Sequence, residues 1–203
     1  YWVKYGSTAN DPYITGGWAQ HTWGTAIGDY MKTSQSADPY DNVDGSTSFY
    51  NWPSNVKLTC SDMVDEGVAA DDGTYGRKLF YEARGYSVTE CFNQTTDNKY
   101  AGAFSLANFQ AEINAGHAVM LNLKGHTIVG YGYDGATIYI RDTWDNDPAH
   151  TYTMPWGGSY EGMELLSVSV VNLVPIIPDT ERVTLPMLLK HYLPGQSPTD
   201  ILL

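Results

Sequence analysis

The segment from Gly125 to Trp144, "GHTIVGYGYDGATIYIRDTW", decides the fold and contains the candidate chemistry. Two short runs rich in β-branched and aromatic residues flank an Asp-Gly dipeptide, which is typical of a hairpin turn. If the loop holds three residues ending at that glycine, His126 lies directly opposite Asp142, with Cβ atoms roughly 5 Å apart. A strict two-residue turn shifts the register by one and puts the two side chains on opposite faces. The sequence allows both registers.

The remaining chain predicts the layers around this hairpin. Short apolar runs separated by Gly, Asp and Pro indicate further strands at 87–91, 117–123, 151–156 and 165–173. Before them, helical spacing predicts a helix from Thr25 to about Thr33, one that ends before Gly85, and one that begins at Ser105 and ends at Gly116. Helices followed by antiparallel strands indicate an α+β fold.

The predicted domain organisation is one domain, 1–174, and a tail, 175–203. A chain of 203 residues can build one substantial core. The tail is punctuated by proline and departs from the strand pattern, and its "TLPMLLKHYL" stretch (184–193) predicts one short helix. We expect this tail to be a linker or a docking segment.

Charge and composition limit the partners. The net charge is −12 with 11 Lys and Arg residues, so the surface repels phosphate backbones and anionic membranes. No apolar run is long enough to span a membrane. We therefore expect neither nucleic acid nor membrane as a partner, while the oligomeric state stays open. Abundant Tyr, Trp, Thr, Asn and Gly with little Lys favour a secreted or extracytoplasmic protein. In such a protein Cys60 and Cys91 could form one disulfide, whereas in the cytosol they would be small buried residues; the sequence leaves the pairing open.

The sequence resembles the papain-like cysteine peptidases at three separated motifs. That family opens its catalytic helix with Gln, five residues and the nucleophilic Cys; here Gln20 is followed by "HTWGT" and Ala26. The family histidine begins a strand of the type His-x-apolar-apolar-Gly-Tyr-Gly, which His126 matches in "GHTIVGYGY". The third member, Asn or Asp, precedes a Trp by two positions, as Asp142 does in "RDTW". The order along the chain also agrees with the family.

Within that family, "INAGHAVMLNLKGHTIVGYGYD" and "DTWDNDPAHTYTMPWGG" look like the bacterial peptidases related to those that remove double-glycine leaders from bacteriocins. The resemblance covers about residues 15 to 173. It implies a papain-like fold in which an N-terminal catalytic helix packs on an antiparallel sheet, and a peptide or protein substrate. No transporter segment is present, so double-glycine specificity is not carried over.

The resemblance also implies a role for each matching residue. Position 26 would carry the nucleophile at a helix N-terminus, where partial positive charge stabilises a thiolate. Gln20 would donate to the oxyanion, His126 would act as base and then acid, and Asp142 would orient it. Trp144 would shield the histidine and aspartate, and Gly24 and Thr25 would line the substrate groove.

Ala26 departs from the family pattern, because a methyl group cannot attack a carbonyl. Either a cysteine has been replaced at this position, or the domain is a natural pseudoenzyme that keeps its groove for binding. We therefore expect an inactive relative of enzymes that hydrolyse peptide bonds by a Cys-His-Asp mechanism. The alternative functions are a non-catalytic peptide-binding domain and an extracellular interaction domain on the same scaffold.

The sequence offers two other candidate sites, a cysteine nucleophile elsewhere in the chain and a calcium site. Cys60 or Cys91 could be the nucleophile, but neither follows a Gln at the family spacing. Oxygen ligands in the loop that holds Asp38, Asp41 and Asp44 suit calcium, although the spacing is not that of an EF-hand and Asp-rich loops are usually solvated turns. No cofactor is expected apart from this calcium alternative.

Overall fold

A computed structural model of the chain describes residues 22–34, 45–144, 147 and 149–175. The helices are α2 (Ile27–Tyr30), α3 (Cys60–Asp65), α4 (Gly73–Glu82) and α5 (Leu106–Asn114), with one 3-10 turn at Ala69–Asp71. The strands are β1 (Leu58–Thr59), β2 (Tyr86–Thr95), β3 (Val119–Leu123), β4 (His126–Asp134), β5 (Thr137–Arg141), β6 (Tyr152–Pro155), β7 (Ser159–Tyr160) and β8 (Met163–Pro175). The α+β prediction is confirmed.

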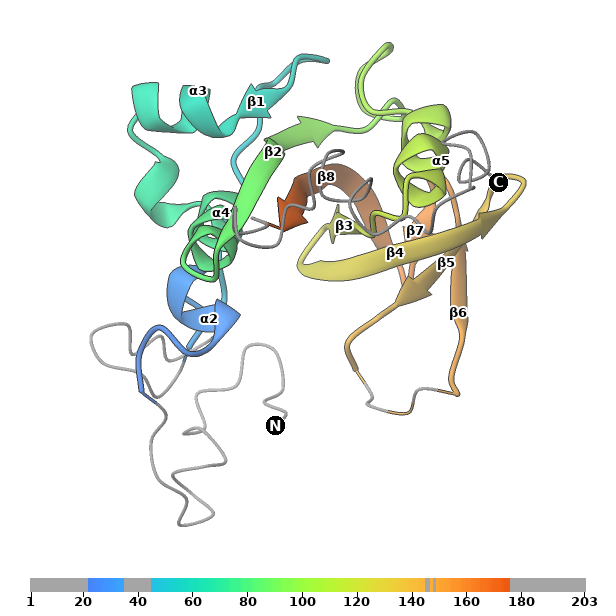
Figure 1. Ribbon diagram of the computed structural model, residues 1–203. Helices are drawn as coiled ribbons and strands as arrows, with labels where there is room; N and C mark the ends of the chain where they lie inside the picture. The colour runs from blue at the N-terminus through green and yellow to red at the C-terminus, as the bar shows by residue number, and fades with distance from the viewer. Residues whose placement is uncertain (1–21, 35–44, 145–146, 148, 176–203) are drawn as a thin grey trace, which may run out of the picture.

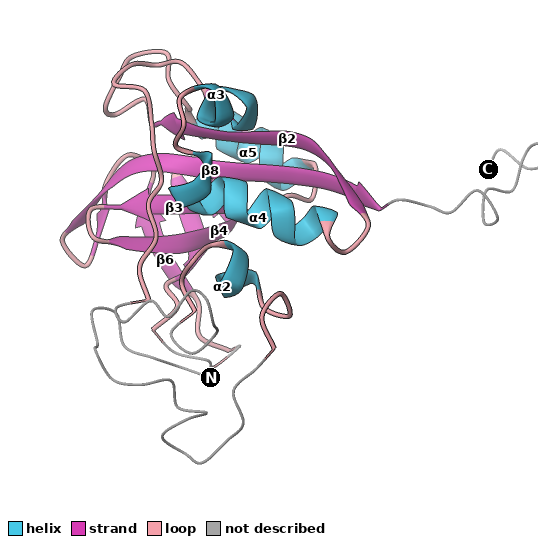
Figure 2. Ribbon diagram, turned by 90° about the vertical axis from the view of Figure 1, so that its left-hand side faces the viewer, coloured by secondary structure: helices cyan, strands magenta, loops and turns pink. Residues whose placement is uncertain are grey.

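The described strands form one antiparallel sheet in the order β1-β2-β8-β3-β4-β5-β6, and β7 pairs with β8. Strand β8, the last described element of the chain, lies in the interior of the sheet between β2 and β3. It joins a half that carries α2, α3 and α4 to a half built from hairpins and α5 (Figure 1). Helices α4 and α5 lie on opposite faces of β8 (Figure 2).

The main core fills the space between α5 and the sheet. Phe109 of α5 is fully buried there against Leu121 of β3 and Ile128 of β4. A Cβ at Gly130 would lie 2.6 Å from the Phe109 ring, so the glycine in the "IVGYG" run allows this close approach. Helix α5 thus covers the apolar face of β3 and β4.

The predicted C-terminal end of α4 and both predicted ends of α5 are confirmed. Ser105 caps α5 by accepting a hydrogen bond from the Asn108 backbone N–H, and Gly116 follows that helix with φ 84°. Gly85 ends the α4 segment with φ 81°. These local signals act within a few residues, so the sequence alone determines them.

The helix predicted from Thr25 to about Thr33 is much shorter, because α2 spans only Ile27–Tyr30. Lys32 takes a left-handed φ of 59°, and the Thr33 N–H donates to the Gly28 carbonyl over 2.8 Å. This pattern is a Schellman motif, which closes a helix. The motif normally has glycine at the left-handed position. Because lysine stands there instead, the sequence does not indicate that the helix ends here.

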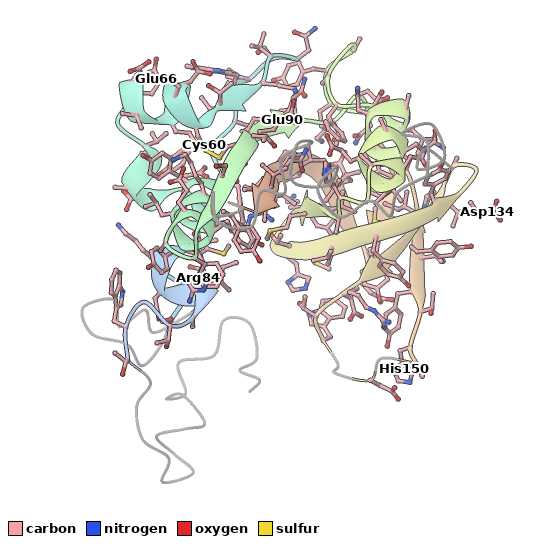
Figure 3. The ribbon with its side chains drawn as sticks, viewed as in Figure 1. Cys60, Glu66, Arg84, Glu90, Asp134 and His150 are labelled. Carbon is pink, nitrogen blue, oxygen red and sulfur yellow. A yellow bond between two sulfur atoms is a disulfide. The ribbon has the colours of Figure 1, made fainter. Side chains whose placement is uncertain are left out.

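Cys60 and Cys91 form a disulfide that ties the start of α3 to β2, with Cα atoms 5.4 Å apart (Figure 3). Around it lies a second core, in which Leu58, Cys60 and Met63 are buried. Both sulfurs are consumed by the bond, so neither cysteine is available as a thiolate nucleophile in this structure.

Apart from Pro175, which ends β8, the predicted tail lies outside the described residues, as does the segment 1–21. The tail prediction, 175–203, therefore stays a prediction beyond Pro175, as does the domain boundary near 174. Within the described ranges, every helix is too short or too polar to cross a bilayer.

Helix α2 packs on α4 at Gly76, and this contact gives a first prediction. A Cβ at Gly76 would lie 2.3 Å from the Tyr30 carbonyl oxygen and 2.8 Å from the Met31 Cα. Backbone atoms cannot move aside as a flexible side chain can, so we expect Gly76→Ala to cost about 1–3 kcal/mol of unfolding free energy. Urea unfolding followed by tryptophan fluorescence measures this loss. Lys78→Ala, on the same helix, serves as the control and should change the midpoint little; equal effects would contradict the packing argument.

Candidate active site

His126 is the first residue of β4 and pairs with Leu123 across a tight turn. Leu123 is buried, and the imidazole is half-buried beside it. The next residue on the same face, Ile128, is fully buried in the main core. The histidine therefore lies at the edge of the core, on a rigid strand.

The hairpin adopts neither of the two registers that the sequence suggested. Its turn is Gly135-Ala136, so Asp134 pairs with Thr137. A bulge between Gly130 and Gly132 then leaves one extra residue on β4. The sequence placed the turn one position too early and gave no sign of the bulge.

The bulge decides where Asp142 lies. Beyond it, Val129 pairs with Arg141, which brings Asp142 level with Ile128 rather than with His126. His126 and Asp142 are therefore not directly opposite, and the register that a three-residue loop would give is not adopted. Because residues two apart on a strand share a face, however, the two still lie on the same side of the sheet.

His126 contacts the main chain of Asp142. Its Nε2 lies 2.7 Å from the Asp142 carbonyl oxygen and 3.2 Å from the Thr143 hydroxyl. A carbonyl oxygen only accepts hydrogen bonds, so the first contact requires a proton on Nε2. In the neutral ring Nδ1 is then the nitrogen without a proton, which is the one that can act as a base.

The Asp142 carboxylate is buried and bound by other groups. It accepts the Trp144 backbone N–H over 3.0 Å and the Tyr160 hydroxyl over 2.8 Å. The intervening Thr143 has a left-handed φ of 68°, which turns the chain back toward the carboxylate. The contacts of the carboxylate thus differ from the family expectation of an aspartate that holds the imidazole directly.

Trp144 covers the histidine. Its ring stacks on the imidazole with centroids 5.1 Å apart and planes inclined by 21°, and it contacts the Tyr160 ring at 5.8 Å. The side chain remains 42% exposed, so it presents an aromatic surface beside the imidazole. This arrangement suits the shielding role that the resemblance implied.

Tyr160 was not expected from the sequence. It lies in β7, eighteen positions after Asp142, and no local pattern distinguishes it from the other tyrosines. Burial, and after it the hydrogen bond to Asp142, raise the pKa of the Tyr160 hydroxyl. The hydroxyl therefore keeps its proton at neutral pH and donates a hydrogen bond to the carboxylate.

Position 26 is the N-cap of α2. The buried Asp29 carboxylate accepts the Ala26 backbone N–H over 3.1 Å and the Gly24 N–H over 2.8 Å. A one-turn helix capped by a carboxylate has a weak dipole and few free N–H groups, so the helix offers less positive charge than a long catalytic helix would. The electrostatic argument made from the sequence is weakened accordingly.

Arg84 supplies positive charge at the same place. Its guanidinium donates to the carbonyl oxygens of Gly24 (3.1 Å) and Thr25 (2.9 Å) and lies over the Phe80 ring, 3.5 Å from its centroid. Figure 3 shows Arg84 beside α2. The residue reaches this segment from the end of α4, which no sequence motif predicts.

The described contacts form two clusters, one around Ala26, Asp29 and Arg84 and one around His126, Asp142 and Trp144. Figure 1 shows α2 at the lower left of the described ribbon and the segment that leaves β5 at the lower right, and the hydrogen bonds and ring contacts named above do not join the two clusters. Gln20, predicted to donate to the oxyanion, lies outside the described residues, as do the calcium candidates Asp38, Asp41 and Asp44. Among the residues that the structure does describe, no three acidic, histidine or cysteine side chains are grouped to hold a metal.

Comparison with known families identifies the scaffold. The model of the Peptidase C39 like family matches residues 57–164, more than half of the chain. The chain belongs to the Peptidase C39 like family. This family is a relative of the papain-like cysteine peptidases, and the match includes His126 and Asp142, whereas position 26 precedes it. No curated protein and no solved structure matches the chain.

Proposed function

We propose that this family member carries a cysteine-peptidase-type site with Ala26 at the position of the nucleophile. The observation that supports it best is the histidine: Nε2 is bound by the Asp142 carbonyl at 2.7 Å and the ring is covered by Trp144. The bond to the carbonyl requires a proton on Nε2, so Nδ1 is the unprotonated and therefore basic nitrogen of the neutral ring, in a family of peptidase relatives. The substrate class is peptides or proteins.

The proposed reaction needs a thiol at position 26. In an Ala26→Cys variant, Nδ1 of His126 would take the thiol proton, and the thiolate would attack the carbonyl carbon of the scissile bond. The imidazolium would then give its proton to the leaving amine as the C–N bond breaks. Water activated by the same nitrogen would hydrolyse the acyl-enzyme and release the acid. Arg84, bound to the carbonyls just before position 26, would favour the thiolate.

The decisive experiment installs that thiol. We expect Ala26→Cys to hydrolyse a casein or peptide-library substrate that the unmodified chain leaves intact, and iodoacetamide to abolish the activity. Adding His126→Ala should lower the rate by about 10²–10⁴-fold, the usual contribution of a general base. Mass spectrometry of the products measures the cleavage.

A matched control separates this site from the effects of any surface thiol. Thr25→Cys places a thiol one residue away, before the helix begins, and should stay inert. If Ala26→Cys is also inert across broad peptide libraries, the peptidase proposal fails.

The alternative is a peptide-binding domain on the same scaffold. The exposed Trp144 ring beside the imidazole favours it, because a partly exposed aromatic offers contact area to a bound chain. Micromolar or tighter binding of a peptide by the unmodified chain, lost in Trp144→Ala, together with an inert Ala26→Cys variant, would decide for binding. Whether Ala26 replaces a cysteine or is natural does not alter these tests.

We further propose a secreted or extracytoplasmic location. The Cys60–Cys91 disulfide supports it, since such bonds persist mainly in oxidising compartments. Recovery of the chain from its source with this bond intact after thiol trapping would test the location.

A further inference from the structure

Tyr160 binds the start of the loop that follows β5, where the side chain and the main chain of Asp142 have different partners. The inference rests on the proposed function for its catalytic meaning, although its geometry is independent of any reaction. The residues concerned are His126 at the start of β4, Asp142 just after β5, and Tyr160 in β7.

Asp142 offers two acceptors, and each is committed to a different partner. The carbonyl oxygen takes the His126 Nε2–H at 2.7 Å. The carboxylate takes the Tyr160 hydroxyl at 2.8 Å and the Trp144 N–H at 3.0 Å. Because the carboxylate is buried, losing one of these donors would leave an acceptor without a partner.

The position of the carbonyl depends on the carboxylate. Thr143 is held in the left-handed region, which costs free energy for a β-branched residue and needs the surrounding contacts to maintain it. The hydrogen bonds to Tyr160 and Trp144 close this turn, and the turn aims the Asp142 carbonyl at the imidazole. Tyr160 also contacts the Trp144 ring that stacks on His126.

We propose that Tyr160 is a positioning residue: its hydroxyl fixes the Asp142 carboxylate so that the main-chain carbonyl of Asp142, rather than its carboxylate, orients His126. The carboxylate builds the loop and the carbonyl performs the orienting role. This assignment differs from a triad in which the acidic side chain binds the imidazole.

The experiment follows solvent exchange of the His126 Nε2 proton by NMR in the unmodified chain, labelled with ¹⁵N, at low temperature. We expect Tyr160→Phe, which keeps the ring and removes the hydroxyl, to speed this exchange about tenfold, the effect of losing one hydrogen bond of ordinary net strength. Asp142→Asn should have a smaller effect. The amide oxygen can take the place of Oδ1 and accept the Trp144 N–H, while the amide NH2 takes the place of Oδ2 and donates to the oxygen of the Tyr160 hydroxyl.

Tyr152→Phe is the matched control. Tyr152 lies 6.2 Å from the Tyr160 ring, and its hydroxyl contacts His150 instead of Asp142. Removing it should leave the exchange of the Nε2 proton unchanged. Backbone amides of β3 should keep their protection in all three variants, which distinguishes a local effect from general unfolding.

The order of the effects decides the outcome. If Asp142→Asn speeds exchange more than Tyr160→Phe does, the carboxylate orients the ring directly and the proposal is wrong. It is equally wrong if Tyr160→Phe has no effect. In the Ala26→Cys background, Tyr160→Phe should lower kcat with little change in KM. An inert Ala26→Cys variant combined with the expected exchange order would overturn the peptidase function while leaving the positioning assignment in place.

Discussion

Replacing Asp72 with alanine should destabilise the fold by about 3–5 kcal/mol, since it removes a helix cap and leaves buried donors without partners. One carboxylate oxygen caps α4 by accepting from the Thr74 and Tyr75 N–H groups at 2.7 and 3.2 Å. The other accepts the Tyr50 N–H and the Asn93 side-chain amide, both at 2.8 Å. Asp72 therefore links the loop at Tyr50, helix α4, on which α2 packs, and strand β2 of the sheet. Urea unfolding at neutral pH gives the loss.

Asp72→Asn provides both the control and a pH test. The amide keeps the shape and one oxygen acceptor, so its cost at neutral pH should be well below that of alanine. Burial, partly offset by the hydrogen bonds, raises the pKa of Asp72 above its ordinary 3.8. The unfolded chain therefore loses this proton first as the pH rises. The part of the stability that comes from this difference in pKa is fully present below 3.8 and is lost as the pH rises through the folded-state pKa. The hydrogen bonds that Asp72 accepts are a separate contribution, and they are what the alanine variant lacks at neutral pH.

The stability of the unmodified chain relative to Asp72→Asn should accordingly fall between acidic and neutral pH. Urea unfolding of both proteins across that range measures the difference. A relative stability that rises with pH would show that the hydrogen bonds outweigh the burial and would contradict the expected sign.

Removing the Cys60–Cys91 bond should cost about 3–4 kcal/mol, because it frees a loop of some thirty residues in the unfolded chain. The double variant Cys60→Ala/Cys91→Ala avoids placing new polar atoms in the second core, where Cys60 is buried. Unfolding in urea with and without reductant measures the effect. Reductant should lower the midpoint of the unmodified protein and leave that of the double variant unchanged.

The part of the molecule that loses stability when the disulfide is removed can also be tested. Cys60 lies in α3 and Cys91 in β2, on the far side of β8 from the β4–β5 hairpin. Hydrogen exchange should increase first in α3 and β1, while the amides of β4 keep their protection. A parallel increase in both regions would mean that the two halves unfold as one unit.

Several site residues could be named from the sequence because their signals are short-range or belong to a family pattern. His126, Asp142 and Trp144 lie on or just after one hairpin, so strand pairing brings these segments together, although the register decides which face each side chain takes. Tyr160, Arg84 and Asp29 could not be found this way. Each acts through a contact that depends on the folded arrangement, such as the Arg84 bonds to the Gly24 and Thr25 carbonyls.

The sequence by itself determined the α+β class, the end of α4, both ends of α5, and the identity of the hairpin residues. These features depend on hydrogen bonds within a few positions and on the alternation of apolar side chains, which are local properties of the chain. Only the tertiary structure decided the register of β4 against β5, the shortness of α2, and which acceptor of Asp142 meets His126. The bulge in β4 shifts the register, the left-handed backbone at Lys32 ends α2, and the left-handed backbone at Thr143 turns the chain after Asp142. These backbone conformations are stabilised by packing against distant residues rather than by the local sequence.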